Sequence, residues 1–155
     1  TRPPRPGERE GQDYFFVDAE RFRQGIAAGE WAEWAEVHGN CYGTSRAFID
    51  GAMAAGRDVL LDIDVQGAAQ ILERYPEAVT IFIMPPSMEV LRQRLMGRAT
   101  DAEAVIARRL SDARGEMACR DRYRHVVVND RLEEALEALL AILTAERGAP
   151  QRGEG

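Results

Sequence analysis

The sequence predicts an α/β protein with a parallel sheet that carries helices on both faces. From about residue 57 onward, apolar runs alternate with helical patterns, which is typical of a doubly wound sheet. The runs VLLDID, AVTIFIM and HVVV are apolar enough to be buried on both faces, as parallel strands usually are. The first 45 residues are more polar and indicate short antiparallel strands. We therefore expect a small α+β insertion carried on the sheet.

The N-terminal part of the chain has clear turn and cap signals. Asp18 precedes an amphipathic pattern and is a suitable N-cap, whereas Gly56 follows one and is a typical helix end. Two β-type runs meet at His38–Asn40, as in a hairpin. We expect, in order, a short strand over 14–17, a helix over 18–29, a strand pair over 31–44 and a helix over 44–56.

The rest of the chain repeats the order strand then helix. Its last helical pattern carries leucines at helical spacing. We expect a buried strand over 57–64, a helix over 65–75, a buried strand over 78–84, helices over 87–98 and 101–119, a strand over 125–130, a closing helix over 131–147 and a frayed tail over 149–155.

Composition restricts the function. The chain has 155 residues, a net charge of -6 and 20 basic residues, all of them arginine. An acidic chain with dispersed arginines argues against general nucleic-acid binding, and no apolar run is long enough to cross a membrane. Cys41 and Cys119 match neither a disulfide framework nor a metal-ligand spacing, and no secretory signal is visible. We expect a cytoplasmic protein, and leave open whether it forms a homo-oligomer.

Taken together, the polar motifs closely resemble those of guanylate kinase, from residue 1 to about 145. The specificity of the resemblance comes from the order and spacing of the whole set. The motifs are Arg2-x-x-Arg5, Gly7-Glu8, Asp13-Tyr14-x-Phe16, Glu33-Trp34-Ala35-Glu36, Gly39-Asn40-x-Tyr42-Gly43-Thr44, Leu61-Asp62-Ile63-Asp64-x-Gln66-Gly67, Pro85-Pro86-Ser87, Arg94-Leu95-x-Gly97-Arg98, Arg109-Leu110 and Val128-Asn129-Asp130.

The resemblance implies a P-loop kinase-like fold and phosphoryl transfer from ATP to GMP, giving ADP and GDP. Guanine offers two adjacent donors, which one carboxylate can accept, and one acceptor oxygen, which a hydroxyl can serve. By resemblance, Glu33 and Thr44 read the base, and Asp62 lies beside them or near a magnesium-bound water. The residues implied for the GMP phosphate are Arg2, Arg5, Tyr14 and Tyr42.

The resemblance also implies a lid whose arginines stabilise the transferring phosphoryl group. The implied catalytic residues are Arg94, Arg98 and Arg109. Asn129 and Asp64 are expected on the ATP side, with Mg²⁺ that no protein-only metal site holds. The expected divisions are a GMP-binding region over 1–46, a core over 47–89 and 115–148, a lid over 90–114 and a tail over 149–155.

One family feature is absent from the sequence. No G-x-x-x-x-G-K-[ST] motif occurs, and a chain without lysine cannot supply the phosphate-binding lysine of that loop. We therefore expect this sequence to be a fragment that is poorly folded and inactive by itself. Two alternatives stay open: a non-catalytic guanylate-kinase-like interaction domain, and a nucleoside-monophosphate kinase for another base.

Overall fold

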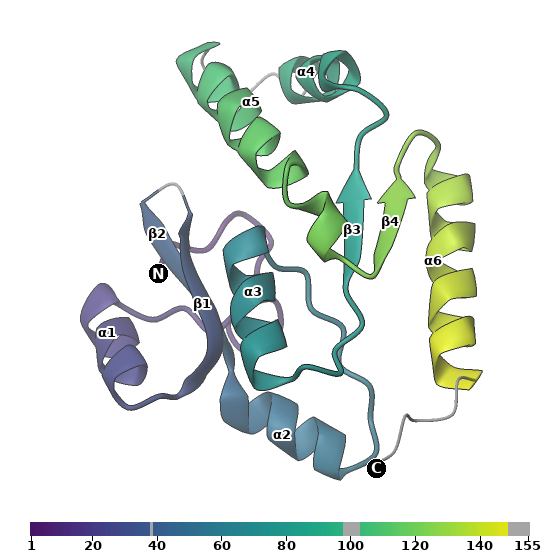
Figure 1. Ribbon diagram of the computed structural model, residues 1–155. Helices are drawn as coiled ribbons and strands as arrows, with labels where there is room; N and C mark the ends of the chain where they lie inside the picture. The colour runs from purple at the N-terminus through teal and green to yellow at the C-terminus, as the bar shows by residue number, and fades with distance from the viewer. Residues whose placement is uncertain (38, 98–102, 149–155) are drawn as a thin grey trace. The chain divides into compact units, whose positions relative to one another are not determined.

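The computed structural model describes residues 1–37, 39–97 and 103–148, and the chain divides into two compact units (Figure 1). The first unit spans Thr1–Ala78 and the second Val79–Gly155. Each unit has its own small sheet: an antiparallel pair in the first and a parallel pair in the second.

The first unit begins with helices and strands close to the predicted ranges. Its elements are α1 (Ala19–Ala27), β1 (Trp31–Val37), β2 (Asn40–Ser45), α2 (Arg46–Ala54) and α3 (Val65–Arg74). Asp18, Ser45 and Asp64 cap the three helices, each accepting a hydrogen bond from a backbone N–H in the first turn. The predicted strand pair is confirmed, and its register sets Glu33 opposite Thr44 and Ala35 opposite Tyr42.

The core of the first unit lies where α2, α3 and β1 meet. Ala32, Ile49 and Ile71 form its buried cluster. The Phe22 ring stacks on Trp31 at a centroid distance of 4.8 Å, so that α1 is held against the start of β1. Apolar burial and one aromatic pair thus fix the hairpin within this unit.

Two predicted strands are wrong. Residues 57–64 belong to no sheet among the described residues, although burial alternates along them: Val59, Leu61 and Ile63 pack on the core cluster while Leu60 is 84% exposed. Alternating burial is what a strand with one face on the core would show, but a strand must also form backbone hydrogen bonds with a neighbouring strand. Residues 14–17 form only an isolated bridge, between Glu10 and Tyr14, because the chain turns back on itself there.

The second unit contains the parallel pair. Its elements are β3 (Ile81–Met84), α4 (Met88–Gly97), α5 (Glu103–Met117), a 3-10 turn (Arg120–Arg122), β4 (His125–Val128) and α6 (Leu132–Gly148). β3 and β4 pair in parallel, which confirms the predicted strand type. α6 runs beside β4, and Glu146 binds both Arg124 at 3.1 Å and His125 at 2.8 Å (Figure 1).

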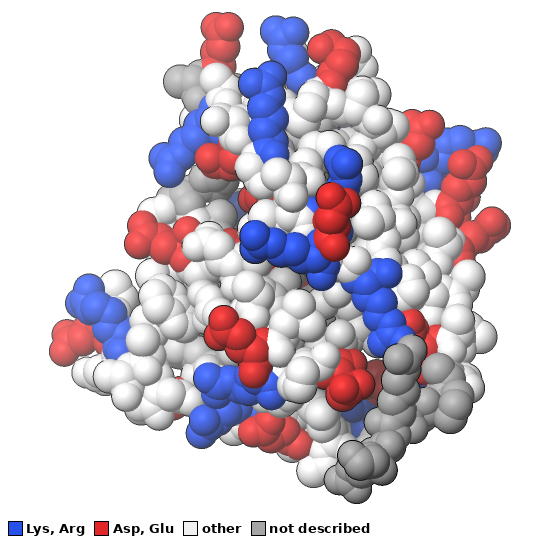
Figure 2. All heavy atoms as spheres, in the orientation of Figure 1, with Lys and Arg blue, Asp and Glu red and all other residues white. Residues whose placement is uncertain are grey.

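The surface mixes both signs of charge. Figure 2 shows basic and acidic side chains interspersed over one face, without a continuous basic stripe on that face. Within the described residues, no helix combines the length and the apolar character that a membrane crossing requires.

Candidate functional site

The first unit contains a buried carboxylate. Glu33 is 4% exposed, and it is the buried charged residue among those the structure describes. Both Ala32 and Glu33 point inward, which a regular strand would not allow; the register of β1 shifts between Trp31 and Glu33. The irregularity therefore turns a carboxylate towards the interior at the cost of regular pairing.

Polar neighbours surround this carboxylate. The Thr44 hydroxyl donates a hydrogen bond to Glu33 Oε1 at 2.5 Å across the strand pair. Burial raises the pKa of Glu33 above its usual value, and the negative charge of Asp64 adds to that rise, while the Thr44 hydrogen bond opposes it. Glu33 Oε1 thus accepts a hydrogen bond from the Thr44 hydroxyl, and that hydroxyl can rotate and donate to another acceptor.

The two aspartates of the LDID motif differ in their surroundings. Asp64 is the N-cap of α3: it accepts from Gly67 N at 2.8 Å and from Gln66 Nε2 at 3.1 Å. Asp62 is exposed. The structure therefore gives Asp64 a local role in the helix, whereas the Asp62 carboxylate faces solvent.

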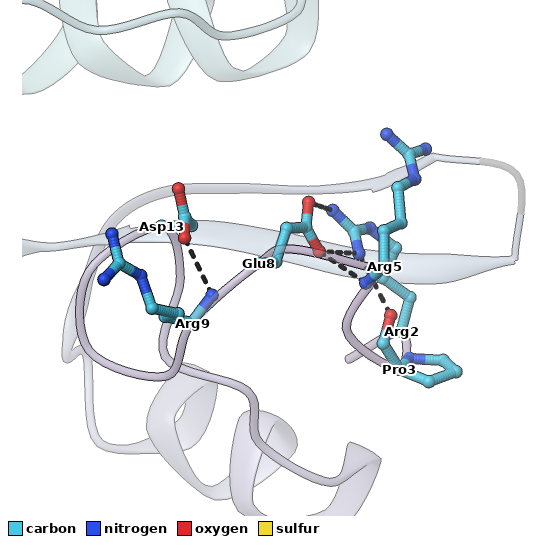
Figure 3. Close-up of polar contacts among 6 residues, drawn as sticks. All are labelled: Arg2, Pro3, Arg5, Glu8, Arg9 and Asp13. Carbon is cyan, nitrogen blue, oxygen red and sulfur yellow. Dashed lines mark hydrogen bonds and ion pairs between the residues drawn. The ribbon is translucent and has the colours of Figure 1, made fainter.

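The opening segment forms a compact turn on β2. Thr1 binds Cys41 twice, through its amino group at 2.8 Å and its hydroxyl at 2.9 Å. Arg2 donates from both terminal nitrogens to the Glu8 carboxylate, each at 2.6 Å (Figure 3). This ion pair lowers the pKa of Glu8 to about 2, with help from the Arg5 backbone N–H, which donates to Glu8 at 2.7 Å.

Three of the four residues predicted to hold a phosphate, Arg2, Tyr14 and Tyr42, lie close together. The Arg2 guanidinium lies 5.2 Å from the Tyr14 ring centroid, and the Tyr14 and Tyr42 rings are 6.3 Å apart. The Arg5 side chain is exposed and extends away from Glu8 (Figure 3). Sequence reasoning missed Glu8 as the partner of Arg2, although Glu8 was part of the quoted motif.

The predicted lid arginines belong to the second unit. Arg94 on α4 donates to the backbone carbonyls of Asn129 at 2.7 Å and Asp130 at 2.9 Å, so α4 is fastened to the end of β4. Arg109 lies on α5 and is half-buried. Arg98 lies outside the described residues.

In the first unit, Glu33 and Thr44 pair across β1 and β2, and Tyr42 lies two residues from Thr44 on β2. A family model described as guanylate kinase matches residues 1–146. The chain belongs to the guanylate kinase family. The predicted resemblance and the predicted α/β kinase fold are thereby confirmed.

Individual guanylate kinases are similar over most of the chain. The protein from Nitrosomonas europaea is 55% identical over 147 residues, which cover 95% of this chain and 73% of that protein. The one from Geobacter sulfurreducens is 52% identical over 147 residues, covering 95% of this chain and 72% of that protein. A crystal structure of guanylate kinase from Anaplasma phagocytophilum superposes with a TM-score of 0.83 at 41% identity, covering 100% of this chain and 76% of that one.

Proposed function

We propose that the protein transfers a phosphoryl group from ATP to GMP, giving ADP and GDP. The observation that carries this proposal is the Glu33 carboxylate, which is 4% exposed and accepts a hydrogen bond from the half-buried Thr44 hydroxyl at 2.5 Å. A buried carboxylate costs stability unless a partner compensates for it, so its presence argues for a ligand. Family membership supports the same activity.

Glu33 reads the base in this proposal. An ionised carboxylate accepts the N1–H and 2-amino donors of guanine side by side, whereas adenine has no such donor pair. Thr44 releases Glu33 and donates to O6 of guanine. The exchange keeps every polar group bonded, which favours guanine over bases that leave Glu33 unsatisfied.

The phosphate of GMP is held by the arginines and tyrosines of the opening segment. Arg5 supplies an exposed guanidinium fork, and the hydroxyls of Tyr14 and Tyr42 add two donors. Arg2 is the fourth predicted contact, and Glu8 neutralises its charge and holds its fork in one orientation. These residues lie in the predicted GMP-binding region over 1–46, and Asp62, also a predicted GMP contact, is exposed and lies outside that range.

Transfer follows the chemistry of phosphoryl kinases. A phosphate oxygen of GMP forms a bond to the γ-phosphorus of ATP, and the bond to the β–γ bridging oxygen breaks, so that ADP leaves. Arg94, Arg98 and Arg109 stabilise the charge on the transferring group, and Asn129 lies on the adenine side. These four roles come from the family motifs.

Magnesium accompanies the ATP phosphates. Mg²⁺ prefers oxygen donors, keeps several waters and binds through one or two carboxylates plus phosphates. The exposed Asp62 carboxylate fits that donor set, by way of a bound water, better than Asp64, whose two oxygens are bonded to Gly67 and Gln66. The ion supplies charge that neutralises the phosphates.

We place the reaction in the cytoplasm, since Cys41 and Cys119 are free thiols.

A coupled kinase assay on the intact enzyme tests this function. ADP production with MgATP should require GMP, and AMP or UMP should not replace it. A folded protein that binds GMP without any ATP-dependent turnover would favour the non-catalytic interaction domain instead. Equal turnover with AMP would favour a kinase for another base.

A further inference from the structure

The side chain of Gln70, on α3, clamps the backbone of β1. Its Oε1 accepts a hydrogen bond from Trp34 N at 3.1 Å, and its Nε2 donates to Trp34 O at 2.7 Å. A side-chain amide thus bonds to both polar groups of one strand residue, as the backbone of a neighbouring strand would. Trp34 directly follows Glu33, so the clamp acts on the residue next to the buried carboxylate.

The same helix also touches the Glu33 carboxylate. Gly67 lies so close that a Cβ added there would be 2.5 Å from Glu33 Oε2 and 3.2 Å from Cδ. Gly67 and Gln70 are three residues apart and therefore share one face of α3. Helix α3 therefore packs on β1 at two neighbouring residues, at the Glu33 carboxylate through Gly67 and at the Trp34 backbone through Gln70.

We propose that Gln70 is a positioning residue for Glu33 and so sets how strongly the site prefers guanine. The proposal rests on the function proposed above. A carboxylate that accepts two parallel donors must be placed within a fraction of an ångström, because both bonds weaken when it tilts. Gln70 fixes the separation of α3 from β1, and Gly67 then limits where the Glu33 carboxylate can lie.

A purely structural role for Gln70 makes a different prediction. If the clamp only holds α3 on β1, its loss lowers stability and weakens the binding of every nucleotide alike. If it aligns Glu33, its loss affects the 2-amino contact in particular. IMP lacks the 2-amino group of GMP, so the ratio of IMP to GMP dissociation constants measures that contact alone.

The test is calorimetric titration of the intact enzyme with GMP and with IMP. Gln70→Met keeps the length of the side chain and removes both hydrogen bonds, whereas Gln70→Glu keeps the acceptor for Trp34 N. Glu73→Ala, an exposed position one turn away on α3, is the matched control. We expect the preference for GMP over IMP to fall about tenfold in Gln70→Met, less in Gln70→Glu, and to be unchanged in Glu73→Ala.

Thermal melts accompany each titration. A cooperative melt together with an unchanged preference for GMP over IMP, in either Gln70 variant, overturns the proposal. If Gln70→Met does not fold, Gln70→Glu decides the question. A wild-type enzyme that binds IMP as tightly as GMP would instead refute the base-reading function, and the proposal for Gln70 falls with it.

Discussion

At the scale of single residues, Glu33 combines a stability cost with the binding role proposed for it. Its carboxylate is buried, and the negative charge of Asp64 adds to the rise in its pKa. The folded chain therefore binds more protons than the unfolded chain from the usual pKa of 4.5 up to the raised value. The stability that this proton brings is fully present below the unfolded pKa and is lost as pH rises through the folded pKa.

Glu33→Gln should therefore melt at a higher temperature than the wild type at pH 7, with a gap that narrows on acidification. The amide has no charge to desolvate, and its oxygen can still accept from Thr44. The same change should weaken GMP binding about 10- to 100-fold, because the NH2 group of the new amide would face a donor of guanine. Melting curves at pH 7 and pH 5, with and without GMP, measure both effects.

Glu36→Gln changes an exposed residue on the same strand and serves as the control. It should alter neither the melting temperature nor the affinity for GMP. A lower melting temperature for Glu33→Gln at pH 7 would contradict the account of Glu33 as a destabilising buried charge.

At the scale of elements, the start of α3 is shaped around Glu33. Gly67→Ala would set a methyl group 2.5 Å from Glu33 Oε2, so the carboxylate must move. Because that atom is the end of a flexible side chain, we expect GMP affinity to fall tenfold or more and stability to fall less. Calorimetry and denaturant unfolding of the variant measure the two changes separately.

Gly51→Ala is the matched control for this prediction. It lies in α2, where an added Cβ meets nothing within 4 Å. It should stabilise the fold by about 0.4–1 kcal/mol and leave GMP binding unchanged. If Gly67→Ala behaves in the same way as Gly51→Ala, the close contact between α3 and Glu33 has no role in binding.

The sequence predicted the elements better than it predicted their partners. Caps and periodicity located α1, α2 and α3, because those signals lie within the elements themselves. The pattern of residues 57–64 predicted a strand, and its alternating burial is present, but pairing depends on a neighbour that a local pattern does not describe. Glu8 and Gln70 were missed for the same reason: each acts through a tertiary contact, with Arg2 or with the Trp34 backbone.

At the scale of the whole molecule, binding and transfer are assigned to different units. Arg5 belongs to the first unit and Arg94 to the second. Arg5→Ala in the intact enzyme should raise the KM for GMP at least tenfold with a smaller effect on kcat, since Arg5 is proposed to hold the substrate phosphate. Arg94→Ala should lower kcat by 10-fold or more, because Arg94 is proposed to stabilise the transferring phosphoryl group.

Steady-state kinetics with GMP varied at saturating MgATP separate the two effects. Arg92→Ala, at an exposed position on the same helix as Arg94, should change neither parameter. An Arg94→Ala enzyme with altered KM for GMP and normal kcat would show that this arginine binds substrate instead.

A buried carboxylate on β1 is proposed to select guanine. Calorimetric titration of the intact enzyme and of Glu33→Ala with GMP and with AMP tests it most directly. We expect the wild type to bind GMP far more tightly than AMP, and Glu33→Ala to lose about 1.5–3 kcal/mol of GMP binding while AMP binding stays weak. Equal affinity of the wild type for GMP and AMP, or a Glu33→Ala protein that retains full preference for GMP, would contradict the claim.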